Sequence, residues 1–166
     1  MSTRRIAYVA VMAALYVVIG FYITPLLPNP MVRGAVIAIN MVVVVIAGIL
    51  FGPTVGALVG LIGTSLNAVV GPAASRPFEV AAIIPHLIMG FSAGWVARIS
   101  RPVAALTILV GHVLNIAAFI IVRLIPLSDL TATIFSVGLL VEAIIDIVVI
   151  WLAVAVLTPV VRSAPA

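Results

Sequence analysis

The sequence contains no cysteine and no lysine, and only four of its residues are acidic. Without cysteine, the chain has no disulfide framework, no thiol nucleophile and no thiolate metal site. Without lysine, it has neither the amine of a P-loop nor an amine for Schiff-base chemistry. Any ATP-driven work therefore requires that another chain bind the nucleotide.

Charge of either sign is scarce. Charged residues make up 7% of the chain and hydrophobic residues 66%, whereas a soluble domain carries about a quarter charged residues. So few charges cannot cover a water-facing surface, and we predict an integral membrane protein. The net charge of +4 comes from arginines at segment ends. This distribution indicates membrane topology rather than nucleic-acid binding.

Long apolar runs, divided by proline, glycine and arginine, fill most of the chain. Each run is close to the ~20 residues that a helix needs to cross the hydrocarbon core, and the runs do not alternate like barrel strands. We predict an all-α integral membrane protein, a single transmembrane domain over residues 1–166. The helices are expected at about 6–24, 33–51, 53–71, 79–97, 102–122 and 134–158.

The arginines give an orientation. With the N-terminus inside, five of them lie in cytoplasmic segments and three in outer loops, which favours two cytoplasmic termini. The inner set is Arg4, Arg5, Arg98, Arg101 and Arg162, and the outer set is Arg33, Arg76 and Arg123.

In this orientation, the strongly polar residues of the spans converge on one layer, from the middle of the bilayer to its outer face. They are Asn40, Asn67, His86, His112, Asn115, Glu142 and Asp146. A charged group at the bilayer centre costs ~2.5–3.5 kcal/mol on insertion scales. Glu142 and Asp146 lie one turn apart, so both should point into the protein. These two acids either contact a ligand or form a buried structural pair. Asp146, the deeper of the two, could lie at the floor of a cavity or pair with His112.

On the fifth predicted helix, His112, Asn115 and Phe119 share one face. An amide and an aromatic ring along one face suit a flat heterocyclic ligand, although the same polar residues could instead bridge helices. His86 is either a satisfied interior residue or a ligand contact. Two histidines and two carboxylates are chemically sufficient for a metal, but no HExxH-like spacing is present. We therefore expect no metal site, and no catalytic site either.

The inner half is rich in small residues at four-residue spacing, which form flat strips where another helix can approach closely. Each strip either packs inside the fold or contacts a separate subunit. The residues expected to contact a partner are Ala10, Ala14, Gly56 and Gly60.

Two stretches resemble a known family, the substrate-binding S components of energy-coupling factor (ECF) vitamin transporters. "RRIAYVAVMAALYVV" is similar to the first helix of that family, whose AxxxA motif is matched by Ala10 and Ala14. "LFGPTVGALVGLIGTSLN" is similar to the passage from the second helix to the third. The likeness covers nearly the whole chain, with six short helices and both termini inside.

This resemblance implies a vitamin-like substrate bound in an outward-facing cavity lined by helices four to six, where His86, His112, Asn115, Glu142 and Asp146 lie. The first outer loop, residues 24–33, would be the gate. The inner surface would dock on a transmembrane coupling protein driven by a pair of ATPases. The resemblance further implies a multi-pass protein of a prokaryotic cell membrane, with no enzymatic activity and no cofactor.

Substrate identity does not transfer with the resemblance. The Met-His start of the nickel and cobalt members is missing, which argues against a metal-ion substrate. A thiamine-like, pyridoxine-like or queuosine-precursor ligand would each fit. Two other functions stay open: an intramembrane enzyme that uses Glu142 and Asp146 with a histidine, and a small channel or assembly protein.

Overall fold

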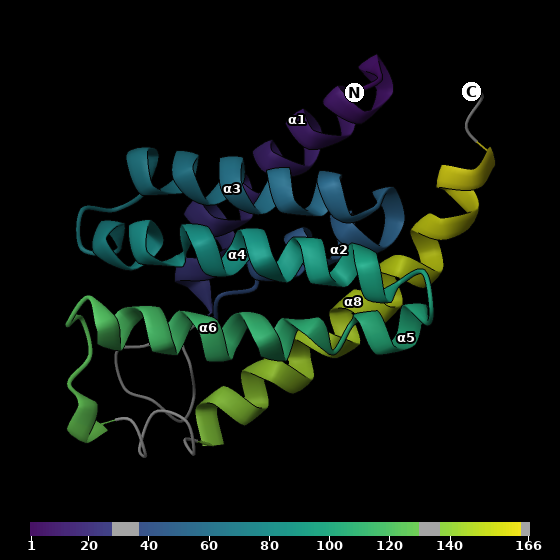
Figure 1. Ribbon diagram of the computed structural model, residues 1–166. Coiled ribbons are helices and arrows are strands. Elements are labelled where there is room, and N and C mark those ends of the chain that lie inside the picture. The colour runs from purple at the N-terminus through teal and green to yellow at the C-terminus, as the bar shows by residue number, and fades with distance from the viewer. Residues whose placement is uncertain (28–36, 130–136, 164–166) are drawn as a thin grey trace.

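The computed structural model describes residues 1–27, 37–129 and 137–163, and every regular element in these residues is helical (Figure 1). The elements are α1 (Thr3–Val18), the π-helical turn η1 (Ile19–Ile23), the short η2 (Thr24–Leu26), α2 (Met41–Phe51), α3 (Pro53–Val70), α4 (Arg76–Val96), α5 (Arg101–Ala104), α6 (Thr107–Ile121), η3 (Leu127–Asp129) and α8 (Val137–Ser163). The N-terminus of α1 and the C-terminal end of α8 lie at the same end of the bundle (Figure 1).

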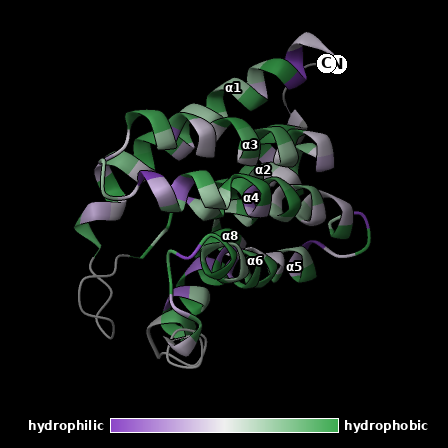
Figure 2. Ribbon diagram, turned by 60° about the vertical axis from the view of Figure 1, so that its left-hand side comes forward, coloured by the Kyte–Doolittle hydropathy of each residue, from purple (hydrophilic) through white to green (hydrophobic). Residues whose placement is uncertain are grey.

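Within these residues, five helical segments are long and apolar enough to cross a membrane. They are Thr3–Leu26, Pro53–Val70, Arg76–Val96, Arg101–Ile121 and Leu139–Val161. The shorter apolar helix α2 is the sixth. Figure 2 shows hydrophobic residues over most of the ribbon, as expected for helices that face lipid. The prediction of an all-α membrane protein with six helices is confirmed.

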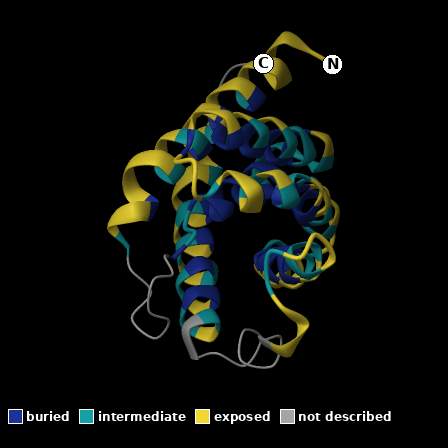
Figure 3. Ribbon diagram, turned by 90° about the vertical axis from the view of Figure 1, so that its left-hand side faces the viewer, coloured by how far each residue is buried: buried dark blue, intermediate teal, exposed yellow. Residues whose placement is uncertain are grey.

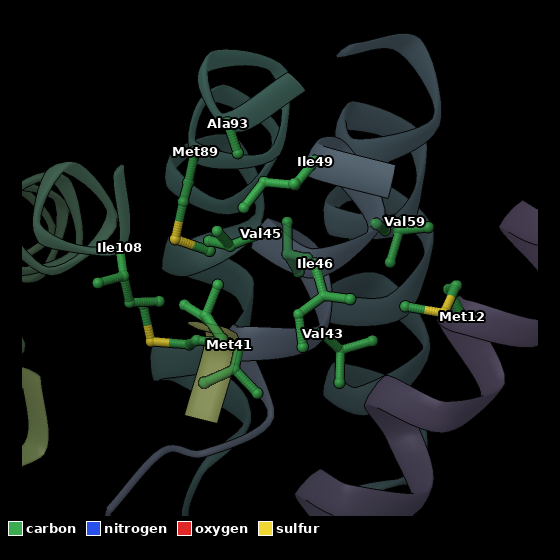
Figure 4. Packing of buried hydrophobic residues seen from close by; sticks show 14 of the residues in the cluster. Met12, Met41, Val43, Val45, Ile46, Ile49, Val59, Met89, Ala93 and Ile108 are labelled. Atoms are coloured by element: carbon green, nitrogen blue, oxygen red, sulfur yellow. The ribbon is translucent and has the colours of Figure 1, made fainter. Parts of the chain in front are cut away.

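The short helix α2 occupies the centre of the bundle and contacts α1, α3, α4, α6 and α8. It is apolar all round, and its residues from Met41 to Ile49 are buried, as expected for a helix enclosed by others. Valine side chains of α2 pack against Met12 of α1, Val59 of α3 and Met89 of α4 (Figure 4). Figure 3 shows the buried residues between the helices and the exposed ones on their outer faces.

The beginning of α2 differs from the expected helix over 33–51. The described part of that range is helical only from Met41, because residues 37–40 form a turn. The backbone N–H of Ile37 donates to the Leu27 carbonyl at 2.8 Å, and that of Ala38 donates to Glu142 Oε1 at 2.8 Å. Distant partners thus take the backbone donors that a longer helix would use.

The glycine strip of α3 packs inside the fold. A Cβ atom at Gly56 would overlap the carbonyl oxygen of Gly90 on α4, and one at Gly60 would overlap that of His86. Both glycines are buried, because α4 lies directly against this face. The expected contact of Gly56 and Gly60 with a separate subunit is therefore corrected to a helix–helix contact within the chain.

Candidate functional site

The first polar group in the bundle is built around His86, whose side chain on α4 is buried. Its Nδ1 lies 2.8 Å from Thr64 Oγ1 of α3 and 3.1 Å from Tyr16 Oη of α1. Its Nε2 lies 3.0 Å from Asn115 Nδ2 of α6. Because an amide nitrogen only donates, Nε2 accepts in this arrangement and Nδ1 carries the ring proton. One neutral histidine thus joins four helices.

A carboxylate extends this group to the start of α4. Glu79, in the first turn of α4, accepts a hydrogen bond from Asn67 Nδ2 at 2.7 Å and one from Tyr16 Oη at 3.5 Å. Tyr16 therefore connects Glu79 with His86. We call this set the His86 network; it consists of Tyr16, Thr64, Asn67, Glu79, His86 and Asn115.

The second polar group, the His112 cluster, consists of His112 on α6 with Glu142 and Asp146 on α8. His112 Nε2 lies 3.2 Å from Asp146 Oδ2, and Glu142 accepts the hydrogen bond from Ala38. One nitrogen or oxygen atom from each of the three buried side chains lies within 4.8 Å of the others. Histidine and carboxylate side chains are the types that could hold a divalent cation, and no local sequence motif indicated that these three lie together.

The two groups form one layer across the bundle. His112 and Asn115 are three residues apart on α6 and share a face, so α6 links the cluster to the network. The layer brings together all of the expected substrate-binding residues except Phe119. The Phe119 ring packs edge to face against Phe78 of α4, with ring centroids 5.2 Å apart and an interplanar angle of 86°.

Five buried oxygen atoms, three of them in the layer, have no hydrogen-bond partner in the described part of the chain. They are Thr24 Oγ1, Asn40 Oδ1, Asn67 Oδ1, Asn115 Oδ1 and Asp146 Oδ1. A buried acceptor without a partner costs ~1–3 kcal/mol, so native proteins rarely retain one without a reason. A bound molecule with several O–H or N–H groups would satisfy these atoms.

Two of these amide side chains, those of Asn40 and Asn67, lie against the π-helical turn of the first span. A Cβ atom added at Gly20, in the π-helical turn η1, would lie 3.0 Å from Nδ2 of both Asn40 and Asn67. Isolated π-helical turns are frequent at functional sites. Thr24, the first residue of the expected gate, is buried beyond this turn. The gate residues 28–33 lie outside the described residues.

The two alanines expected at a partner surface lie on the outer face of α1. Ala10 and Ala14 are exposed, whereas Met12, Ala13 and Tyr16 of the same helix face the core. One side of α1 therefore joins the His86 network through Tyr16, and the opposite, exposed side carries the small-residue strip of Ala10 and Ala14.

Sequence reasoning missed Tyr16, Thr64 and Glu79. Glu79 could have been found, because it is one of four acidic residues in the chain and opens the predicted span over 79–97. Tyr16 and Thr64 gave no such signal, since single hydroxyl groups are common in membrane helices, where neighbouring backbone can satisfy them.

The chain was also compared with known proteins. The family described as "ECF-type riboflavin transporter, S component" matches residues 1–163. No curated protein and no solved structure matches the chain. The match extends over all six helices and therefore over both polar groups of the layer. The chain belongs to the family of S components of ECF-type riboflavin transporters.

Proposed function

We propose that this protein is the substrate-binding subunit of an ECF-type importer and that its substrate is riboflavin. The observation that carries this proposal is the family match over residues 1–163. Riboflavin is captured from outside the cell, in the polar layer, and is released inward after the subunit docks on its partners. The membrane concerned is the cell membrane of a prokaryote, with both termini cytoplasmic.

The chemistry of the layer supports this substrate. Riboflavin combines a flat isoalloxazine ring, which carries an N–H donor, with a ribityl chain of hydroxyl groups. Unpaired acceptors such as Asn67 Oδ1, Asn115 Oδ1 and Asp146 Oδ1 suit a donor-rich polyol. Outside the layer, four residues after Asn115 on α6, Phe119 pairs with Phe78, and these rings offer an aromatic surface to the ring system. The proposed substrate is still a flat heterocycle, as expected from the sequence. It is a flavin, however, and not a thiamine-like, pyridoxine-like or queuosine-precursor molecule.

The outer face of α1 supports docking on a coupling protein. Ala10 and Ala14 lie one turn apart and exposed, so a second helix can approach the α1 backbone closely. The chain carries no P-loop lysine. A pair of ATPase subunits that acts through the coupling protein would supply the energy.

Flavin fluorescence provides the direct test of the substrate. Purified protein in detergent is titrated into riboflavin, and we expect saturable quenching because the ring moves into a protein environment. Thiamine and pyridoxine are then added as competitors, and neither should displace the flavin. If one of these vitamins binds in place of riboflavin, the proposed substrate is wrong, but the proposed role as a substrate-binding subunit stands.

The docking surface makes a separate prediction. Ala14→Trp should abolish riboflavin uptake by cells but leave riboflavin binding by the isolated protein unchanged, since the indole would block close helix approach. Val113→Trp is the matched control, because Val113 is exposed on α6, and α6 and α1 lie on opposite sides of the bundle (Figures 1 and 2). Loss of binding together with uptake in Ala14→Trp would show that this strip packs inside the fold.

A further inference from the structure

Three arginines converge at the end of the bundle that holds the N-terminus of α1 and the C-terminal end of α4 (Figure 1). Arg5 of α1, Arg98 beyond α4 and Arg101 of α5 line one cavity of about 240 Å³. The first turn of α3 forms another part of its wall. That helix begins at Pro53, and Gly52 before it supplies no side-chain cap, so its first backbone N–H groups add positive potential to the same space. We call this space the arginine cavity.

Nothing in the described part of the chain neutralises this charge. Its only salt bridge joins His112 to Asp146, so no arginine is ion-paired there. Arg5 and Arg98 donate no hydrogen bond to the described residues, whereas Arg101 donates to Thr158 Oγ1 at 3.3 Å. Glu79 lies at the opposite end of α4 from Arg98, about 28 Å along the helix. Arg5 and Arg98 are exposed, so their guanidinium groups are free to bind an anion from outside the chain together with Arg101.

An apolar groove adjoins the arginine cavity. It has a volume of about 540 Å³, runs along α8 and shares Ile49 and Arg101 with the cavity. Its wall includes Trp151, whose Nε1 donates to the Pro102 carbonyl at 3.1 Å and so fixes the indole in place. A polar, positively charged space therefore continues into an apolar one, whose wall includes the exposed residues Trp151 and Ala155.

We propose that the arginine cavity and the apolar groove together bind an anionic phospholipid. The phosphate lies among the three guanidinium groups, which suit phosphate oxygens, and an acyl chain lies in the groove along α8. Inorganic phosphate shares the headgroup chemistry but leaves the groove empty. An acidic protein segment could place its carboxylates among the arginines, but it would not account for the adjoining apolar groove. This site is separate from the polar layer and does not depend on the identity of the vitamin.

The test uses the full-length, delipidated protein in neutral detergent. Native mass spectrometry measures the affinity for phosphatidylglycerol, for phosphatidylcholine with the same acyl chains, and for inorganic phosphate. We expect a clear preference for phosphatidylglycerol. The double variant R5Q/R98Q should weaken phosphatidylglycerol binding roughly 10- to 30-fold, because each interfacial arginine contributes on the order of fivefold. Arg76→Gln, which removes an exposed arginine at the opposite end of α4, should leave the preference unchanged.

A groove variant distinguishes the lipid from free phosphate. Ala155→Trp adds a ring at an exposed position of the groove wall, and it should weaken both phospholipids. If inorganic phosphate binds and Ala155→Trp leaves the affinity for both phospholipids unchanged, the ligand of the cavity is a free anion and the proposed phospholipid is wrong. Equal binding of phosphatidylglycerol and phosphatidylcholine, or an equal loss in Arg76→Gln and in R5Q/R98Q, would overturn the site itself.

Discussion

His86→Leu is expected to lower the thermal stability of the protein more than any other single change in the polar layer. The imidazole is the shared partner of Tyr16, Thr64 and Asn115, all of them buried. Leucine fills a similar volume but leaves three polar groups without this partner. Tyr16 and Asn115 each keep one other contact, with Glu79 and with Met41. A lost hydrogen bond costs ~1 kcal/mol, so losing three should cost about 3 kcal/mol. The thermal midpoint in one fixed detergent measures it.

Thr64→Val serves as the comparison for this variant. It is nearly isosteric and removes only one of the contacts of His86, so it should cost roughly 1 kcal/mol. A midpoint of His86→Leu that equals that of the unchanged protein would contradict the role of His86 as the shared partner of four helices.

Glu142→Gln should weaken riboflavin binding roughly 10- to 150-fold, because a hydrogen bond to a charged group contributes ~1.5–3 kcal/mol. The variant should remain folded, since the amide oxygen of glutamine can still accept the hydrogen bond from Ala38. Flavin fluorescence gives the affinity and the thermal midpoint gives the stability, both in the same detergent.

Glu79→Gln is the matched control for this change. Both carboxylate oxygens of Glu79 already accept hydrogen bonds, from Asn67 and Tyr16, so the same substitution should change the affinity for riboflavin less. Unchanged affinity of Glu142→Gln together with a large loss of stability would make Glu142 a structural partner of Ala38 rather than a ligand contact.

Local spacing in the sequence predicted those parts of the layer that lie on one helix. His112 and Asn115 share a face of α6, and Glu142 and Asp146 share a face of α8, because helical periodicity alone fixes these relations. The cost of burying charge then placed both acids inside the bundle, where the structure has them.

Contacts between distant segments could not be predicted in this way. Tyr16 reaches His86 across 70 positions in the chain, and Ala38 reaches Glu142 across 104. The second contact takes a backbone donor before α2, and nothing in the apolar sequence around Ala38 reveals it. The strip of Gly56 and Gly60 likewise showed that a helix approaches closely, but not which one.

The shortness of the central helix has a consequence for how specificity can change. At 11 residues, α2 extends about 16 Å, roughly half the thickness of the hydrocarbon core. Side chains of the surrounding helices reach the beginning of α2, such as Asn115, whose Nδ2 lies 3.6 Å from Met41 Sδ. A point substitution can replace one such side chain without disturbing the packing of the helices, whereas a change within a central helix would disturb the packing of all its neighbours. The same ring of helices can therefore accept a different ligand through point substitutions alone.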